Sequence, residues 1–245
     1  MTSLSELRVK LFADGADLAG IRVYAQDPLI SGFTTNPTLM RKAGIDDYEA
    51  FAHAVLAEIR DRPVSFEVFS DEFDEMADQA RLLASWGANV VVKIPITNTR
   101  REPSYELLRK LAAEGIRLNV TAIMTLDQVR AAAEAVASAP LAYISVFAGR
   151  IADTGRDPVP MMAEAVGILR SYGDLQLLWA SPRELLNVFQ ADTVGCHVIT
   201  ATSDILKKLS SVGKNLDDFS LETVRMFYDD AARAGYSLRA ALTHH

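Results

Sequence analysis

The sequence predicts an α/β fold, and within that class a single-domain (β/α)8 barrel, or TIM barrel, for three reasons. Short apolar segments alternate with amphipathic stretches, and this alternation indicates a parallel sheet covered by helices. Eight such units occur, enough to close a barrel, and 245 residues is a usual length for one barrel domain. The rival is an open, doubly wound sheet, but no Gly-x-Gly-x-x-Gly segment follows the first strand to favour it.

The strands are predicted where apolar and β-branched residues follow one another, because a strand buried on both faces is apolar throughout. We expect them at residues 9–13, 32–34, 64–68, 89–95, 118–121, 141–146, 175–180 and 197–200. The fourth segment reads Asn-Val-Val-Val-Lys-Ile-Pro and holds Lys93 among apolar neighbours.

Amphipathic stretches after these strands predict the helices. We expect them at residues 17–24, 48–60, 72–86, 104–114, 126–137, 159–172 and 204–209. Pro37 suits the first turn of a helix after the second strand, and Ser181-Pro182 is expected to open the helix after the seventh.

A last amphipathic helix, at about residues 221–234, has no strand after it. It could cap its own barrel or pack on a neighbouring molecule. Residues 1–245 are treated as one domain, because neither an internal repeat nor a low-complexity linker is visible. An expression-tag remnant is one interpretation of the terminal His244-His245 pair, to which we assign no function.

Composition limits the class of protein. Hydrophobic residues make up 49% of the chain, enough for a sizeable core, but no apolar run is long enough to cross a bilayer. The first residues lack the basic and apolar regions of a secretory signal, and the lone Cys196 fits a reducing compartment. A net charge of −7 with scattered arginines disfavours nucleic-acid binding. We therefore expect a cytoplasmic protein with neither a membrane nor a nucleic-acid partner.

A lysine inside an apolar strand is unusual, because burial removes the hydration of its ammonium group and favours the free amine. A free amine in a dry pocket can attack a carbonyl and form a Schiff base. Alternatively, the long side chain of Lys93 could extend from the strand end into water. The strand alone does not decide between these two interpretations.

Polar residues also interrupt other apolar segments near the C-terminal ends of the predicted strands, where barrel enzymes carry their active sites. Asn36 or Ser181 could simply cap a helix, and Asp14 could be a turn residue. The carboxylate of Glu67 is costly to bury unless it is paired. Taken together, these polar residues favour a functional role more than any one of them does alone, since all of them would lie at the same end of the barrel. The group comprises Asp14, Asn36, Glu67, Lys93, Asn119, Thr121, Ser145, Arg150, Ser181 and Arg183.

Five segments make the chain resemble the transaldolase family, in its short branch that includes fructose-6-phosphate aldolases. They read Gly-Phe-Thr-Thr-Asn-Pro-Thr-Leu at 32–39, Val-Val-Lys-Ile-Pro at 91–95, Leu-Asn-Val-Thr at 118–121, Ile-Ser-Val-Phe-Ala-Gly-Arg-Ile at 144–151 and Ala-Ser-Pro-Arg at 180–183. They cover most of the chain in the family's order. The Thr-Thr-Asn-Pro segment and the lysine of the fourth strand are the most specific.

The resemblance implies a catalytic set. Lys93 would form a Schiff base with the C2 carbonyl of a ketose phosphate, after which the C3–C4 bond breaks by retro-aldol cleavage. Asp14 matches the aspartate that handles the proton of the C4 hydroxyl. Glu67 and Thr121 match the pair that holds a catalytic water during the imine steps.

The resemblance also implies a substrate-binding set. Asn36, Asn119 and Ser145 match groups that orient the three-carbon fragment, and the two arginines and Ser181 match the phosphate end, where guanidinium groups suit a phosphate. The full set is Thr35, Asn36, Asn119, Ser145, Phe147, Arg150, Ser181 and Arg183. The chemistry requires no cofactor, and no metal is expected because His53 and His197 lack ligand spacing.

Glu67 and Phe147 are of the transaldolase type, whereas the aldolase branch tends to carry glutamine and tyrosine at these positions. We therefore expect a transferase that moves a dihydroxyacetone unit between sugar phosphates, as in the pentose phosphate pathway. The alternatives are an aldolase that releases dihydroxyacetone and a barrel that binds sugar phosphates without catalysis. Val146 and Pro182 depart from the family pattern, and Arg100 and Arg101 are unexplained, so the acceptor stays open. Short family members form rings through a C-terminal helix, which implies a homo-oligomer.

Overall fold

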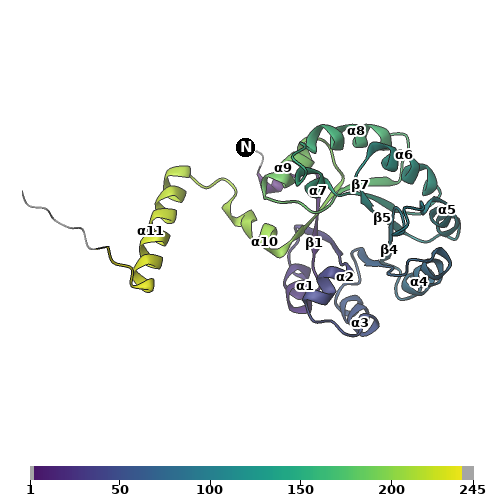
Figure 1. Ribbon diagram of the computed structural model, residues 1–245, viewed down its shortest axis with the longest axis horizontal. Helices are drawn as coiled ribbons and strands as arrows, with labels where there is room; N and C mark the ends of the chain where they lie inside the picture. The colour runs from purple at the N-terminus through teal and green to yellow at the C-terminus, as the bar shows by residue number, and fades with distance from the viewer. Residues whose placement is uncertain (1–2, 239–245) are drawn as a thin grey trace, which may run out of the picture.

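The computed structural model describes residues 3–238, and its eight parallel strands close into one barrel (Figure 1). Each strand pairs with the next, and the first pairs with the last. The strands are β1 (Lys10–Asp14), β2 (Ile30–Thr34), β3 (Val64–Glu67), β4 (Val90–Pro95), β5 (Leu118–Ile123), β6 (Ala142–Val146), β7 (Leu175–Trp179) and β8 (Val198–Thr202). The predicted (β/α)8 barrel is confirmed.

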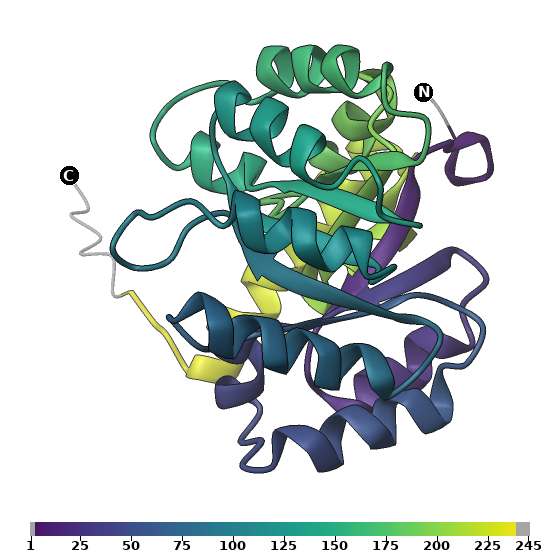
Figure 2. The same cartoon turned by 90° about the vertical axis from the view of Figure 1, so that its right-hand side faces the viewer.

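Helices surround the strands, as Figure 2 shows from the side. They are α1 (Leu18–Ala25), α2 (Pro37–Lys42), α3 (Tyr48–Glu58), α4 (Phe73–Ser85), α5 (Tyr105–Ala113), α6 (Leu126–Ala135), α7 (Ala148–Ala152), α8 (Val159–Leu169), α9 (Leu186–Thr193), α10 (Ser203–Leu206) and α11 (Leu216–Ala234), with short 3-10 helices at Leu4–Glu6 and Lys207–Ser211. Among the described residues, no helix combines the length and the apolar character that crossing a membrane requires.

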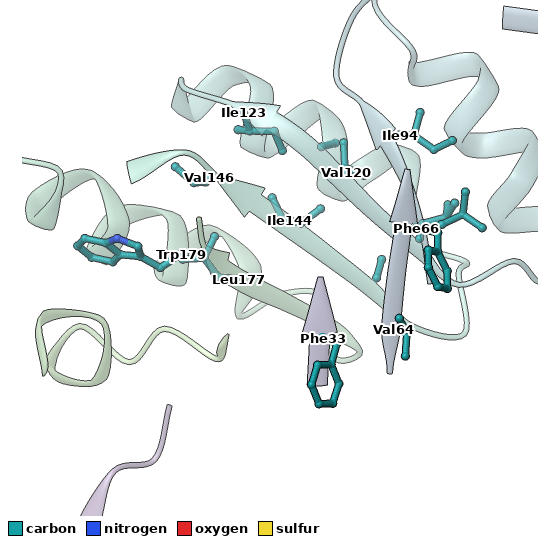
Figure 3. Close-up of a cluster of buried hydrophobic side chains, with 14 of the residues drawn as sticks. Phe33, Val64, Phe66, Ile94, Val120, Ile123, Ile144, Val146, Leu177 and Trp179 are labelled. Atoms are coloured by element: carbon teal, nitrogen blue, oxygen red, sulfur yellow. The ribbon is translucent and has the colours of Figure 1, made fainter. Parts of the chain in front are cut away.

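The main core lies between the sheet and the helices and takes alternate residues along most of the strands. On β4, Val90, Val92 and Ile94 belong to this core, while Val91 and Lys93 alternate with them. Because successive side chains of a strand point to opposite faces, these two face the barrel interior. Figure 3 shows the helix-facing residues of several strands, among them Phe33, Val64, Phe66, Ile94, Val120, Ile144, Leu177 and Trp179.

A second apolar cluster fills the barrel interior. The Phe12 ring meets Tyr143 edge to face, with ring centroids 5.5 Å apart. Gly32 makes room for this ring, since a Cβ atom there would lie 2.5 Å from Phe12 Cζ. Four of its six buried residues precede a polar residue by two positions: Phe12 precedes Asp14, Val91 precedes Lys93, Tyr143 precedes Ser145 and Val198 precedes Thr200. The cluster is therefore the floor beneath a polar layer at the C-terminal ends of the strands.

The structure corrects the prediction after β7. Ser181-Pro182 does not open a helix, because Ser181 has a φ of 59°, in the left-handed region, and α9 begins only at Leu186. Asn187 holds this loop instead, since its Oδ1 accepts the N–H groups of Arg183 at 2.7 Å and Glu184 at 3.2 Å.

The structure also corrects two helices. The last helix, α11, begins at Leu216 and not near residue 221, and Asn215 caps it by accepting the N–H groups of Asp217 and Asp218. The prediction lacks α7, whose five residues are too few to show helical periodicity. Residues 244–245 lie outside the described residues.

Candidate active site

A cavity of about 520 Å³ opens at the C-terminal ends of the strands and gathers eleven of the twelve site residues that the sequence predicts. These eleven are Asp14, Asn36, Glu67, Lys93, Asn119, Thr121, Ser145, Phe147, Arg150, Ser181 and Arg183. They come from seven strands or from the segments that directly follow them, including α7, so the barrel brings together residues that are far apart in the sequence. Thr35 is the exception.

Lys93 points into this cavity and not into open water. Its side chain is 8% exposed, and its Nζ lies 2.9 Å from Glu67 Oε2. Nζ also donates to the carbonyl oxygen of Thr35 at 2.9 Å. These two contacts hold the side-chain nitrogen in place inside the cavity. The amine is thus held beside a carboxylate that can accept its proton.

Register places Glu67 beside the lysine, because β3 and β4 pair Glu67 directly with Lys93. Directly paired residues of neighbouring strands project to the same face of a sheet. The backbone of Glu67 has a further contact: its N–H donates to the hydroxyl of Tyr48, at the start of α3, and its carbonyl oxygen accepts from the same hydroxyl. The position of this carboxylate therefore depends on both β4 and α3.

Asp14 is the last residue of β1, the strand that pairs with β2 on the side away from β3, and it lines the cavity. Its Oδ1 accepts a hydrogen bond from Thr34 Oγ1 at 2.7 Å, and Thr34 Oγ1 in turn lies 2.6 Å from Thr200 Oγ1. Burial raises the pKa of the Asp14 carboxyl, although the charge of Lys93 and the bond from Thr34 oppose the shift. Asp14 is therefore a group that can hold a proton more readily than a surface aspartate.

A chain of polar side chains links β6, β5 and β3, and two of its members, Ser145 and Asn119, line the cavity. Ser145 Oγ donates to Asn119 Oδ1 at 2.6 Å, and Asn119 Nδ2 donates to Ser65 Oγ at 3.1 Å. Next along β5, Thr121 is followed by Ala122, whose φ of 63° coincides with a register shift between β5 and β6. Such an irregularity re-aims side chains, and here it lies at the cavity.

The segment after β2 contributes through its backbone as well as its side chains. Thr35 Oγ1 donates to the Ser65 carbonyl at 3.3 Å, so the Thr35 side chain is tied to the sheet while its own carbonyl meets Lys93. Asn36 does cap a helix, since its Oδ1 accepts the Leu39 N–H at 2.9 Å, and it lines the cavity too. The capping and the functional interpretations of Asn36 are therefore compatible.

Two arginines form the cationic end of the cavity. The Arg150 guanidinium carbon lies 5.9 Å from the centre of the Phe147 ring. Arg183 forms an ion pair with Asp153, its Nε donating to Oδ1 at 2.9 Å, and this pair lowers the pKa of Asp153. A phosphate that binds Arg183 would have to compete with Asp153 for the same guanidinium.

Sequence reasoning missed several residues of the cavity wall. Thr34 and Thr200 follow the inward alternation of predicted strands, which is a signal that could have revealed them. Lys42 reaches the cavity from α2, and no local pattern indicates this. The unexplained Arg100 does not line the cavity, and its guanidinium contacts carboxylates outside it, those of Asp71, Glu72 and Glu102.

No group of three or more His, Cys, Asp or Glu side chains within residues 3–238 is arranged to hold a metal ion. The cavity instead offers a buried amine, two carboxylates and a cationic end. This combination can act on a carbonyl compound that carries an anionic group.

Comparison with solved structures supports the fold. The crystal structure of KGPDC from Streptococcus mutans matches with a TM-score of 0.55 and 9% identity, over 81% of this chain and 90% of that one. A putative lyase/mutase from Burkholderia cenocepacia matches with a TM-score of 0.56 and 16% identity, over 93% and 85%. At such low identity these similarities concern the fold alone.

Comparison of sequences is more specific. The model of the family described as Transaldolase/Fructose-6-phosphate aldolase matches residues 11–244. A probable transaldolase of Dehalococcoides mccartyi is 35% identical over 82% of this chain and 90% of its own length. Probable transaldolase 2 of Listeria monocytogenes is 37% identical over 83% and 89%. A probable transaldolase of a Thermoanaerobacter species is 35% identical over 94% and 100%. The chain belongs to the transaldolase/fructose-6-phosphate aldolase family.

Proposed function

We propose that the protein is a transaldolase that transfers a dihydroxyacetone unit from a ketose phosphate to an aldose acceptor through a Schiff base on Lys93. The observation that carries the proposal is the buried Lys93 amine, held 2.9 Å from the Glu67 carboxylate inside the cavity. Family membership supports an aldolase-type enzyme. A cytoplasmic location, with the pentose phosphate pathway as one setting, is part of the same proposal.

The first step forms the imine. The Lys93 ammonium gives a proton to Glu67, and the free amine attacks the C2 carbonyl to form a carbinolamine. Loss of water from this adduct needs a proton on the departing hydroxyl, which Glu67 returns through a water held with Thr121. Glu67 thus ends the step as it began, as a carboxylate beside a cationic nitrogen.

The second step breaks the C3–C4 bond of the ketose. Asp14 takes the proton of the C4 hydroxyl, the C3–C4 bond breaks, and its electron pair enters the iminium to give an enamine while an aldehyde leaves. The enamine then attacks an acceptor aldehyde, and Asp14 returns the proton to the new alkoxide. Burial raises the pKa of Asp14, which suits a group that must hold this proton between the two half-reactions.

Transfer is favoured over release by Phe147, which lines the same cavity as Lys93 and has no hydroxyl. An aldolase must protonate the enamine, and a tyrosine at this position would bring a proton source or position a water. The aromatic ring of Phe147 packs with the apolar floor, which leaves the enamine for an incoming aldehyde.

Borohydride trapping tests the proposal. With fructose 6-phosphate, the peptide that carries Lys93 should gain the mass of a reduced dihydroxyacetone fragment, and turnover should require an acceptor such as erythrose 4-phosphate. The variant Lys93→Met should lose kcat/KM by several orders of magnitude. Lys10→Met, at an exposed lysine of β1, is the matched control and should retain activity. An unmodified Lys93 peptide contradicts the mechanism, and free dihydroxyacetone without acceptor indicates an aldolase.

We also propose that the protein is a homo-oligomer. Helix α11 stands away from the barrel in Figure 1 and has no buried residue. It exposes Phe219, Leu221, Val224, Met226 and Phe227. Side chains of this size lower the free energy when they are removed from water, so a second copy of the chain is the partner that the proposal assigns to them.

A further inference from the structure

The hydrogen-bond ladder between β2 and β3 stops before the end of β3. The last paired residues are Thr34 and Ser65, and the Thr35 N–H still donates to the Ser65 carbonyl at 3.1 Å. In a continued parallel ladder the Thr35 carbonyl would next accept the N–H of Glu67. It accepts Lys93 Nζ instead, at 2.9 Å. The ladder is therefore open at the point where the lysine needs an acceptor.

Tyr48 replaces the missing ladder partner. Its hydroxyl accepts the Glu67 N–H at 3.0 Å and donates to the Glu67 carbonyl at 2.9 Å, so one side chain binds both ends of one residue. The ring packs against Phe66, Phe69 and Trp86, with centroids 6.4, 5.4 and 6.2 Å away. Burial raises the pKa of Tyr48, so the hydroxyl keeps its proton and its ability to donate.

We propose that Tyr48 is a positioning residue of the active site. By binding the backbone N–H and C=O of Glu67 in place of β2, its hydroxyl leaves the Thr35 carbonyl free for Lys93 and fixes the Glu67 carboxylate beside the amine. The catalytic part of this inference rests on the proposed Schiff-base function. Tyr48 does not line the cavity, so it acts through Glu67 and not on the substrate.

The test compares Tyr48→Phe with Tyr24→Phe. Both variants keep the aromatic ring and lose one hydroxyl. Tyr24 lies on α1, outside the cavity, and its hydroxyl donates to Ser203 Oγ at 3.0 Å. A merely structural role would give both variants a similar small fall in Tm and nothing more. Two further readouts separate the roles: the hydrogen exchange of the Glu67 amide, measured by NMR without substrate, and the rate of imine formation, measured by rapid borohydride quenching.

We expect both readouts to change in Tyr48→Phe alone. Because Lys93 occupies the Thr35 carbonyl, the Glu67 amide loses its acceptor in this variant, and its exchange should quicken by about two- to tenfold, the effect of one lost hydrogen bond. Imine formation should slow by about tenfold for the same reason, with kcat falling and KM nearly unchanged. If Tyr48→Phe exchanges the Glu67 amide at the wild-type rate, or forms the imine at the wild-type rate, the proposal is overturned. If the wild-type protein itself forms no imine, the proposed function fails, and exchange alone decides whether Tyr48 holds Glu67.

Discussion

Asp14 shows how one buried carboxyl links function to stability. Burial raises its pKa in the folded protein, so the folded chain binds this proton more tightly than the unfolded chain does. Such a group contributes stability at pH values below its unfolded pKa, and that contribution is lost as pH rises through the folded pKa. At pH values above this raised pKa, the burial of the ionised Asp14 carboxylate therefore lowers the free energy of unfolding.

The variant Asp14→Asn should remove this dependence. Its free energy of unfolding relative to wild type should increase as pH rises from the ordinary pKa of an aspartate through the raised pKa of folded Asp14, because the amide has no charge to bury. Activity should fall by about 10²- to 10⁴-fold through loss of the acid–base group. Urea unfolding of both proteins at several pH values checks the first effect. A difference that is constant with pH would contradict it.

The residues of the site were predictable to different degrees. Lys93 stands out because a cation interrupts an apolar run, and Asn36 because it precedes a proline. Tyr48 gives no such signal, since an aromatic residue at the start of an amphipathic helix is ordinary. Its contact with Glu67 depends on where the β2–β3 ladder ends, and the sequence of either segment alone does not show that.

At the scale of elements, α7 and the loop after β7 hold the cationic end of the cavity together. Gly149, in α7, lies against the Ser181 backbone so closely that a Cβ atom would be 1.5 Å from the Ser181 carbonyl oxygen. Only glycine permits this approach, because a backbone atom cannot turn aside as a side chain can. The positions of Arg150 and Arg183 therefore depend on it.

Gly149→Ala should separate the two segments. We expect a loss of about 3 kcal/mol of stability from the overlap and a rise in KM for phosphorylated substrates, because the two arginines move apart. Gly167→Ala is the matched control: Gly167 lies inside α8 with open space around its Cα, so alanine should stabilise by about 0.5–1 kcal/mol. Thermal unfolding and steady-state kinetics measure both. An unchanged KM in Gly149→Ala would contradict the expected link.

The same region shows where element prediction fails. Ser-Pro is a typical start of a helix, and the sequence gives no sign that Ser181 adopts a left-handed conformation. That conformation is set by the neighbouring α7 and by Asn187, which binds the loop backbone. By contrast, the long strands were predictable within one or two residues, because burial on both faces leaves a continuous apolar run.

At the scale of the molecule, the closed barrel followed from the alternation of segments, whereas the placement of α11 did not. Its periodicity predicts a helix with an apolar face, but no pattern within one chain says what that face covers. The structure leaves it exposed, with no buried residue along α11.

Removal of residues 213–245 should therefore leave a folded barrel of monomer size, because α11 buries nothing in the core of its own chain. Circular dichroism and light scattering test the two parts of this expectation. In the full chain, Phe227→Ser on the exposed apolar set should weaken assembly, while Arg225→Ser, at an exposed polar position of the same helix, should not. A truncated chain that fails to fold would show that α11 stabilises the barrel directly.

The pairing of β1 with β8 closes the sheet and leaves it without an edge strand. Every strand of the cylinder has a neighbour on both sides, so no row of unpaired peptide groups is available to a foreign polypeptide. Amyloid fibrils grow by adding strands to such a row. A chain that lacks residues 213–245 would have neither the exposed apolar side chains of α11 nor an unpaired strand edge, and it should stay monomeric at concentrations where the full chain associates.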